Sequence, residues 1–316
     1  MRGDSVEDPT SKLRFVGNRF SRLFEKAIDT LEPSVMQTLR PVVLTYWDTY
    51  YGPRPPLDGV LNDTRILELI DKKKINPLAN KRKLPELLAK AEVEHVAPVT
   101  YASHEAAMAH VGGRVPIWFF KNVYGTGGKD MFCVASEDLG KTSLPKNFVI
   151  QAGVQNLALI DDKKFTTRVY VMIWDGRIFF YENGFLMIHA AKYESSSADY
   201  EVQIDHSGYA KPGSAVKMQQ LVNYSEYNFF VPKLRELIQT LAPIFSDAKA
   251  AAGKNSYILL GIDTLLQANG DVQLIEVNTF PNFVHTTEII DKVNVPFFKS
   301  ALLTMLGTKV DSLVEL

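Results

Sequence analysis

Cysteine is nearly absent from this chain of 316 residues, which contains Cys133 alone. A single cysteine excludes an internal disulfide and a zinc site built from cysteines, and such sparing use fits a reducing compartment. Long apolar runs are absent as well: none approaches the roughly 18 to 20 residues that cross a bilayer, and the N-terminus lacks the apolar core of a secretory signal. We therefore expect a soluble, cytoplasmic protein with no membrane span.

An excess of charge of either sign is also lacking, since 35 lysines and arginines stand against 36 aspartates and glutamates. No overall field therefore favours nucleic acid or an anionic membrane, and any site for an anion must be local. The composition, 46% hydrophobic and 22% charged, is that of a globular protein long enough for two or three packed subdomains. We expect chemistry on small molecules or peptides, with no nucleic-acid partner.

Residues 1–33 are expected to form a polar tail followed by one amphipathic helix. Between residues 13 and 31 apolar side chains recur at helical spacing, and the opposite face is basic. Such a helix could lie on a membrane surface. Docking on the protein body, or on a second subunit of a homodimer, is the commoner outcome, and we predict it here.

A small α/β domain is predicted over residues 34–75. The β-branched and aromatic run at residues 42–46 predicts a strand, residues 47–56 form a loop, and residues 63–74 are expected to be helical. Strand, loop and helix in this order are typical of the opening of such a domain.

Beyond residue 75 the chain changes from helical segments to short strands separated by turn residues. Tight turns are predicted at residues 174–177 and 269–271, which contain Asp-Gly and Asn-Gly. The predicted helices are residues 83–91, 103–111 and 231–242, and the predicted strands are residues 95–100, 117–121, 131–135, 148–151, 168–174, 178–182, 257–265 and 272–277.

Three oxygen ligands are expected to converge at the last predicted hairpin. Asp263 lies in the run LGIDTLL, and Glu276 and Asn278 lie two apart in the run QLIEVNTFPNF, so strand pairing can bring all three to one face. Magnesium takes carboxylate oxygens and leaves room for phosphate oxygens, so the array fits one or two ions that bridge ATP phosphates. The alternative is a pair of polar positions on a half-exposed sheet, although an unpaired charge inside an apolar strand is costly.

A glycine-rich loop lies between two predicted strands in the run FFKNVYGTGGKDMFCV. Because the glycines do not open a helix, a Rossmann or P-loop site is excluded. The arrangement fits a flap in which the backbone N–H groups around Gly127 and Gly128 close over phosphates, with Lys121 and Lys129 adding positive charge. A plain glycine-rich turn with surface lysines is an equal alternative.

The run KKFTTRVYVMI places Lys164 and Arg168 four residues apart at the start of a strand, on the same face. A lysine acts as a point charge for phosphate, whereas the fork of an arginine can hold a carboxylate or an acyl phosphate. Two cations that lead into a buried strand therefore suggest an anionic ligand. A surface hairpin with solvated charges is the alternative.

Taken in chain order, Lys121, the glycine loop, FVIQAGV, KFTTR, Asp263 and EVN resemble the ATP-grasp superfamily over about residues 75–300. More narrowly, they resemble its tubulin–tyrosine ligase-like branch, in which a K-F-D-x-R-x-Y-V run, a strand aspartate and an E-x-N run are characteristic. The resemblance implies an ATP-grasp fold of the α/β (α+β) class, preceded by the small N-terminal domain. Two α+β subdomains, residues 76–148 and 149–316, would hold the nucleotide between them.

The same resemblance implies the cofactors ATP and Mg²⁺ and a role for each matched residue. The implied contacts are Lys81, Lys121, Gly127 and Gly128 on the phosphates, Gln151 in the hinge against adenine, Lys164 on the nucleotide, Arg168 on an acyl phosphate, and Asp263, Glu276 and Asn278 on magnesium. Lys164 and Arg168 are then the catalytic candidates. The implied activity is the joining of a carboxylate to an amine, with an amino acid and a peptide or small molecule as substrates.

Some positions depart from the family pattern on the side where the branch places its substrate. Thr166 stands in place of the aspartate of K-F-D, Met187 stands where the family usually has arginine, and a family asparagine is replaced near Asp205 and His206. We interpret these changes as a different acceptor rather than tubulin modification. The alternatives are an ATP-grasp phosphotransferase that acts on a hydroxyl and a nucleotide-binding protein without turnover.

Overall fold

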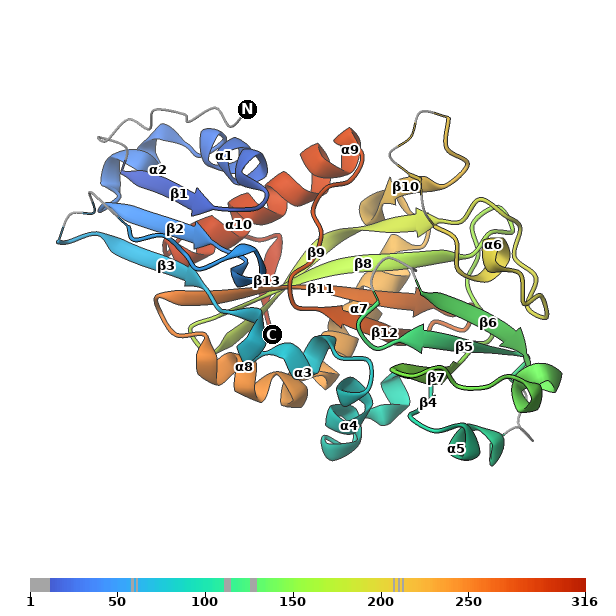
Figure 1. The fold of residues 1–316 in the computed structure, drawn as a ribbon. Coiled ribbons are helices and arrows are strands. Elements are labelled where there is room, and N and C mark those ends of the chain that lie inside the picture. Colours follow the sequence, from blue (N-terminus) through green and yellow to red (C-terminus); the bar gives the residue numbers. More distant parts are fainter. Residues whose placement is uncertain are drawn as a thin grey trace.

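The computed structural model describes residues 12–57, 60, 62–110, 115–125, 130–206, 208–209, 211 and 213–316. Over these residues the chain forms two β-sheets with helices packed against them, as Figure 1 shows. The mixed α and β class expected from the sequence is therefore confirmed. No helix within this described part is long and apolar enough to cross a membrane.

Nine strands of the described chain form the larger sheet: β1 (Leu13–Gly17), β2 (Val42–Tyr46), β3 (Arg65–Leu69), β8 (Phe165–Trp174), β9 (Arg177–Ile188), β10 (Lys217–Gln220), β11 (Ser256–Leu266), β12 (Val272–Asn278) and β13 (Leu313–Glu315). Their order is β1-β2-β3-β11-β8-β9-β10, with β12 paired to β11 and β13 paired to β9. The first three strands are parallel to one another and β3 is parallel to β11, whereas the other pairs are antiparallel.

The smaller sheet has four strands in the described chain: β4 (Thr100–Tyr101), β5 (Ile117–Asn122), β6 (Met131–Ala135) and β7 (Phe148–Ala152), in the order β4-β7-β5-β6. On one face, Trp118 and Ile150 belong to a small apolar core shared with α5 (His104–Met108). Because side chains alternate along a strand, Phe119 and Lys121 point to the other face. The Lys164 ammonium nitrogen lies 5.0 Å from the Phe119 ring centroid there, so this face is turned toward the larger sheet.

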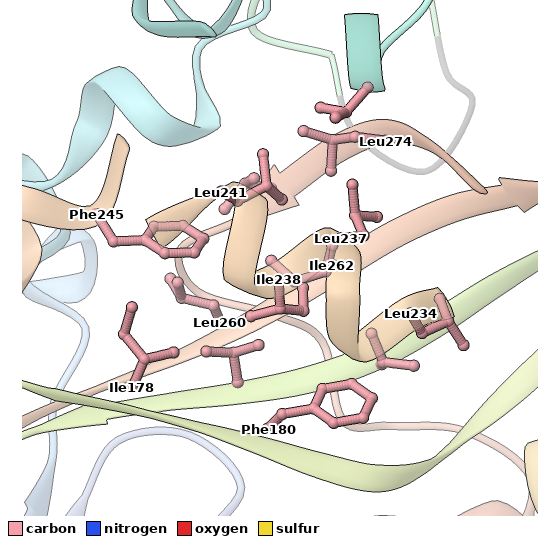
Figure 2. Packing of buried hydrophobic residues seen from close by; sticks show 14 of the residues in the cluster. Ile178, Phe180, Leu234, Leu237, Ile238, Leu241, Phe245, Leu260, Ile262 and Leu274 are labelled. Carbon is pink, nitrogen blue, oxygen red and sulfur yellow. The ribbon is translucent and has the colours of Figure 1, made fainter. Parts of the chain in front are cut away.

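The remaining helices are α1 (Ser21–Asp29), α2 (Pro33–Thr38), α3 (Asn76–Ala79), α4 (Lys83–Lys90), α6 (Tyr200–Gln203), α7 (Tyr227–Thr240), α8 (Ser246–Ala251), α9 (Thr287–Ile289) and α10 (Val295–Met305). On one face of the larger sheet, α7 packs on β9 and β12, and Figure 2 shows Ile238 in the same apolar core as Phe180 and Ile262. On the other face, α1 and α10 pack together, with Phe24 stacked on Phe298 at 4.1 Å between ring centroids. The central strands are therefore buried on both faces.

The single helix predicted over residues 13–31 is wrong, because β1 and α1 occupy this stretch. Leu13 and Phe15 are buried, alternate with partly exposed residues and pair with β2, so pairing in the sheet overrides the helical spacing. Phe20 then adopts a left-handed backbone with φ of 58°, which separates the strand from the helix. Helix α1 itself docks on the protein body, as predicted.

The helix predicted at residues 63–74 is also wrong, since Arg65–Leu69 is strand β3. This strand lies between β2 and β11, which pair with it on its two sides, and Leu67 and Leu69 are buried. A 3₁₀ turn at Lys72–Lys74 follows it. Burial between two strands again decides against local helical spacing.

The strand predicted at residues 95–100 is mostly wrong. A 3₁₀ turn occupies Glu94–Val96, and only Thr100–Tyr101 is extended and paired. Pro98 lies between the two segments and has no N–H to donate to a neighbouring strand.

The other predicted helices and strands are confirmed, although α7 begins at Tyr227 rather than at residue 231 and β9 continues to Ile188 rather than ending at residue 182. The turn between β8 and β9 is tight, because Asp175 and Gly176 both have positive φ, 51° and 70°. The division into a tail, a small N-terminal domain and two further subdomains stays a prediction.

Candidate functional site

Two acidic side chains and an arginine stand side by side across three strands of the larger sheet. Asp263 of β11 pairs in register with Arg168 of β8 on one side and with Glu276 of β12 on the other. Directly opposed residues of antiparallel strands point to the same face, so the three side chains form one row. The Arg168 guanidinium donates to both carboxylate oxygens of Asp263, with 2.6 Å between Nη2 and Oδ2.

Asn278 joins this row from β12, two residues beyond Glu276. Its Nδ2 donates to Oδ2 of Asp263 at 3.1 Å and to Oε1 of Glu276 at 3.2 Å. The register of β11 against β12 shifts directly after Asp263, and such bulges are common beside active sites. The structure therefore brings together the three residues expected to converge, while their role as metal ligands stays a prediction.

Gly261 leaves room for the arginine on β11. A Cβ atom at this position would lie 2.9 Å from Cβ of Pro281 and 3.0 Å from Cδ of Arg168. Either neighbour would have to move to accept a larger residue.

Replacing Gly261 by alanine is expected to lower the free energy of unfolding by about 1 kcal/mol or more, because the added Cβ crowds a packed site. Urea unfolding measures the change. Gly253→Ala is the matched control, since the nearest atom to its Cβ would be 4.0 Å away. Equal unfolding free energies of the two variants would show that the Arg168 side chain moves aside without loss of stability.

Lysine side chains approach the row from two other elements. Lys81 follows α3, and its Nζ lies 3.6 Å from Oε2 of Glu276 and donates to the Gly125 carbonyl oxygen at 2.6 Å. Lys121 of β5 donates to the side-chain oxygen of Gln151 on β7. Two predicted phosphate contacts and the predicted hinge residue therefore lie at the edge of the same site.

Lys164 lies just before β8, four residues from Arg168, and is only 5% exposed. Its Nζ donates to the backbone oxygen of Gln203 at 2.8 Å, and the Phe119 ring centroid lies 5.0 Å away. Along an extended strand four residues span about 13 Å, so Lys164 stands apart from the carboxylates. It lies on the same face of the sheet, between the larger and the smaller sheet.

Burial shifts the charge states of these groups. It lowers the pKa of Lys121 to about 8, since Glu276 offsets it only in part, and it lowers the pKa of Lys164 to about 7. Burial alone would raise the pKa of Glu276, but Lys81 and a hydrogen bond with Asp263 bring it down to about 2. Burial also raises the pKa of Asp263. Close to neutral pH, both buried lysines can therefore gain charge when an anion binds.

A cavity of about 410 Å³ adjoins the row at Glu276. Small-molecule sites are typically concave, mainly apolar and about 300 to 1,000 Å³ in volume, with a few polar groups. The polar end of this cavity is formed by Lys81, Lys121, Gln151 and Glu276, and its apolar wall includes Leu84, Leu88, Val149, Leu274 and Val277. The cavity therefore has the size and polarity expected of a small-ligand site.

The row offers donors that fit a divalent cation. Asp263 and Glu276 provide carboxylate oxygens on adjacent strands, and the Asn278 amide carries a further oxygen, all ligands that magnesium prefers. Within the described part of the chain no group of three or more histidines, cysteines or acids could hold a metal. A magnesium ion here would therefore need the asparagine together with water or phosphate oxygens.

The two clearest departures from the family pattern, Thr166 and Met187, lie next to each other on adjacent strands. Thr166 on β8 pairs in register with Met187 on β9, which pairs in turn with Met218 on β10. This second row lies two residues from Arg168 on the same face, and its side chains are neutral.

Some predicted residues cannot be placed and some contacts were not foreseen. Gly127, Gly128 and Lys129 lie outside the described residues. The contacts of Lys164 with Gln203 and Phe119 join segments far apart in the chain, and no local pattern signals them. Sequence reasoning also passed over Gly261, although its position two residues before Asp263 is a local signal.

Comparison with known proteins adds a family. A model of the tubulin-tyrosine ligase family matches residues 72–206 and 232–312, which is more than half of the chain and includes the whole row and all three lysines. Tubulin glycylases 3B and 3D of Tetrahymena thermophila are 23% identical over 219 residues and 24% identical over 208 residues. These alignments cover 61% and 57% of this chain, and 18% and 20% of the relatives.

A protein of Schizosaccharomyces pombe, named as a probable tubulin–tyrosine ligase, is 23% identical over 180 residues. The alignment covers 49% of this chain and 44% of that relative. The chain therefore spans less than half the length of each of these three proteins.

Proposed function

Because this chain belongs to the tubulin–tyrosine ligase family, we propose that it is an ATP-dependent ligase that joins a carboxylate to an amine. The observation that carries the proposal is the row of Arg168, Asp263, Glu276 and Asn278 beside a cavity with two lysines at its polar end. The names of the relatives, tubulin glycylases and a tubulin–tyrosine ligase, favour an amino acid as one substrate. A peptide or small molecule is the other.

The proposed reaction has two steps. A carboxylate resists attack by an amine because of its resonance and negative charge, so transfer of the γ-phosphoryl group of ATP to a carboxylate oxygen, with release of ADP, gives a reactive acyl phosphate. The amine nitrogen then bonds to the acyl carbon, phosphate leaves with the electron pair of the C–O bond, and the amine loses a proton. The protein's tasks are to position the groups and to stabilise negative charge.

The row and the lysines suit these tasks. Mg²⁺ held by Asp263, Glu276 and Asn278 would neutralise charge on the phosphates. Lys81 is already drawn toward Glu276, at 3.6 Å, so its ammonium group stands where phosphates would meet the row. The Arg168 fork bonds to both oxygens of Asp263 and matches the paired oxygens of an acyl phosphate equally well.

The nucleotide is proposed to lie between the two sheets, as in ATP-grasp enzymes. The apolar wall of the cavity offers a surface for the adenine, with Gln151 at its edge, and the polar end offers lysines to the phosphates. This placement leaves the neutral row of Thr166 and Met187 for the acceptor. A change of acceptor relative to the family pattern is therefore part of the proposal.

Hydroxylamine added during turnover tests the reaction. It should intercept the acyl phosphate and yield a hydroxamate of the carboxylate substrate, in step with ADP release from pooled amino acids and Mg-ATP. A product phosphorylated stably on a hydroxyl, without hydroxamate, would favour a phosphotransferase. Binding of ATP with no release of ADP under any mixture would favour a nucleotide-binding protein without turnover.

ATP binding is expected to take up protons between about pH 7 and 9, because phosphates favour the charged forms of Lys164 and Lys121, whose pKa values lie at about 7 and 8 in the free protein. Affinity should therefore fall as the pH rises through this range. Calorimetry in buffers with different protonation enthalpies measures the uptake. Identical heats in all buffers would show that neither lysine changes its charge on binding.

A further inference from the structure

A buried polar network lies behind the row, where the chain continues past Asn278. Nδ2 of Asn294 donates to the Phe283 carbonyl oxygen at 2.9 Å and lies 3.0 Å from Nδ1 of His285. The Tyr170 hydroxyl donates to Oδ1 of the same asparagine at 3.0 Å. Asn294 and Tyr170 are fully buried, and His285 is 8% exposed.

This network fixes the proton of the imidazole. A backbone carbonyl can only accept, so the amide atom of Asn294 that faces Phe283 must be the nitrogen. The same nitrogen faces Nδ1 of His285, which must therefore accept through its lone pair. In the neutral ring the single proton then sits on Nε2, for which no hydrogen-bond partner is found among the described residues.

His285 is linked to the arginine of the row through Phe185. Its ring centroid lies 4.5 Å from that of Phe185, and Phe185 is the register partner of Arg168 on β9. Burial, followed by the charge of Arg168, lowers the pKa of His285 to about 3. The hydrogen bond with Asn294 acts in the opposite direction and raises this pKa, but by less. Tyr209, with its ring 6.1 Å away, also faces the ring. The imidazole is therefore neutral at any physiological pH.

The backbone around Asn294 departs from a regular helix. Ile290–Asn294 forms a π-helical turn between α9 and α10. Such turns are rare and occur frequently at functional sites, because the extra residue redirects a side chain. Here the turn ends at Asn294, the residue that holds the His285 ring. The irregular backbone therefore places the side chain that orients the imidazole.

We propose that His285 contacts the substrate as a neutral hydrogen-bond donor, with its Nε2–H bound to an oxygen of the carboxylate or acyl phosphate beside Arg168. The inference rests on the ligase function proposed above and names a residue that sequence reasoning did not. A neutral imidazole can donate to an oxygen that gains negative charge and keep its proton throughout. The guanidinium of Arg168 would supply positive charge, and the hydrogen bond from His285 would orient the substrate oxygen.

Replacing His285 by phenylalanine tests this role, because the ring is kept and the donor is lost. We expect kcat for hydroxamate formation, from hydroxylamine and pooled amino acids, to fall tenfold or more with ATP affinity unchanged. His285→Gln should retain more activity than His285→Phe, since its amide nitrogen can donate near the position of Nε2. His110→Phe, at an exposed site, is the matched control and should leave kcat unchanged.

A second measurement on the wild-type protein does not depend on the folding of a variant. Long-range ¹H–¹⁵N spectra should show His285 protonated on Nε2 and unprotonated on Nδ1, without change between about pH 5 and 8. A proton on Nδ1, a titration in this range, or an unchanged kcat in His285→Phe while the wild-type protein ligates would overturn this inference alone. A wild-type protein that forms neither hydroxamate nor amide would overturn the ligase proposal and this inference with it.

Discussion

Arg168→Lys is expected to lower turnover about 10²-fold or more while ATP binding persists. Lysine keeps the positive charge but lacks the planar fork that bonds to two oxygens at once. Asp263 would remain paired with a cation, so the row should stay assembled. Loss of one donor to a developing oxyanion costs about 10² to 10³ in kcat in other enzymes, and we expect a cost of the same order here.

The measurement is the rate of ADP release and of hydroxamate formation at saturating Mg-ATP, with ATP affinity determined by calorimetry. Arg177→Lys is the matched control, because Arg177 is 43% exposed and lies at the start of β9, at the far end of the β8–β9 pair from the row. A variant at position 168 that turns over like this control would remove Arg168 from the reaction. Loss of ATP binding would instead assign the arginine to the nucleotide.

Glu276→Gln is expected to weaken binding of Mg-ATP at least tenfold, about 1.4 kcal/mol. The substitution keeps the shape of the side chain but removes a carboxylate that would coordinate the ion, and it leaves Lys81 without its 3.6 Å partner. In the presence of a chelator the two proteins should bind ATP equally weakly. The effect should therefore appear only with magnesium.

Calorimetric titrations with and without Mg²⁺ measure this difference. Glu236→Gln serves as the control, since Glu236 is 67% exposed and pairs with Lys233 on the surface of α7. If Glu276→Gln binds Mg-ATP as tightly as the control, the metal assignment at the row fails. A tenfold loss that persists with the chelator would mean that Glu276 acts through Lys81 and not through an ion.

The convergence of Asp263, Glu276 and Asn278 was predictable because its geometry follows from local rules, whereas the pairing of Arg168 with Asp263 was not foreseen. Glu276 and Asn278 are two apart on a strand and must share a face, and the Asn-Gly turn before them fixes which strand pairs with β12. Asp263 stands out because a charged residue inside an apolar strand needs a partner. Strand alternation and the cost of a buried charge were sufficient here.

Other parts of the fold depend on contacts that the sequence does not display. Residues 13–31 carry apolar spacing that fits a helix, yet Leu13 and Phe15 also alternate as a strand requires, and only the presence of β2 beside them decides. The stretch at Arg65–Leu69 is similar, because its neighbours β2 and β11 come from opposite ends of the chain. When a segment fits both helical spacing and strand alternation, its own sequence cannot decide between them, because the choice depends on a strand from elsewhere in the chain.

His285 shows the same limit at the site. A single histidine in a loop does not reveal which ring nitrogen carries its proton, since that is set by Asn294 at the end of a π-helical turn. Functional groups whose character depends on a second buried residue are therefore the ones that sequence reasoning misses first.

The parallel pairing of β3 with β11 also constrains the order in which the chain can fold during synthesis. Glu68 pairs with Ser256, so β3 cannot complete its pairing until β11 has left the ribosome, about 190 residues later. At about 5 to 20 residues per second this interval lasts on the order of 10 to 40 seconds. Until then β3 has an unpaired edge that can pair with other chains. We therefore expect that anything which covers this edge before β11 is made, such as a chaperone, lowers aggregation of the nascent chain.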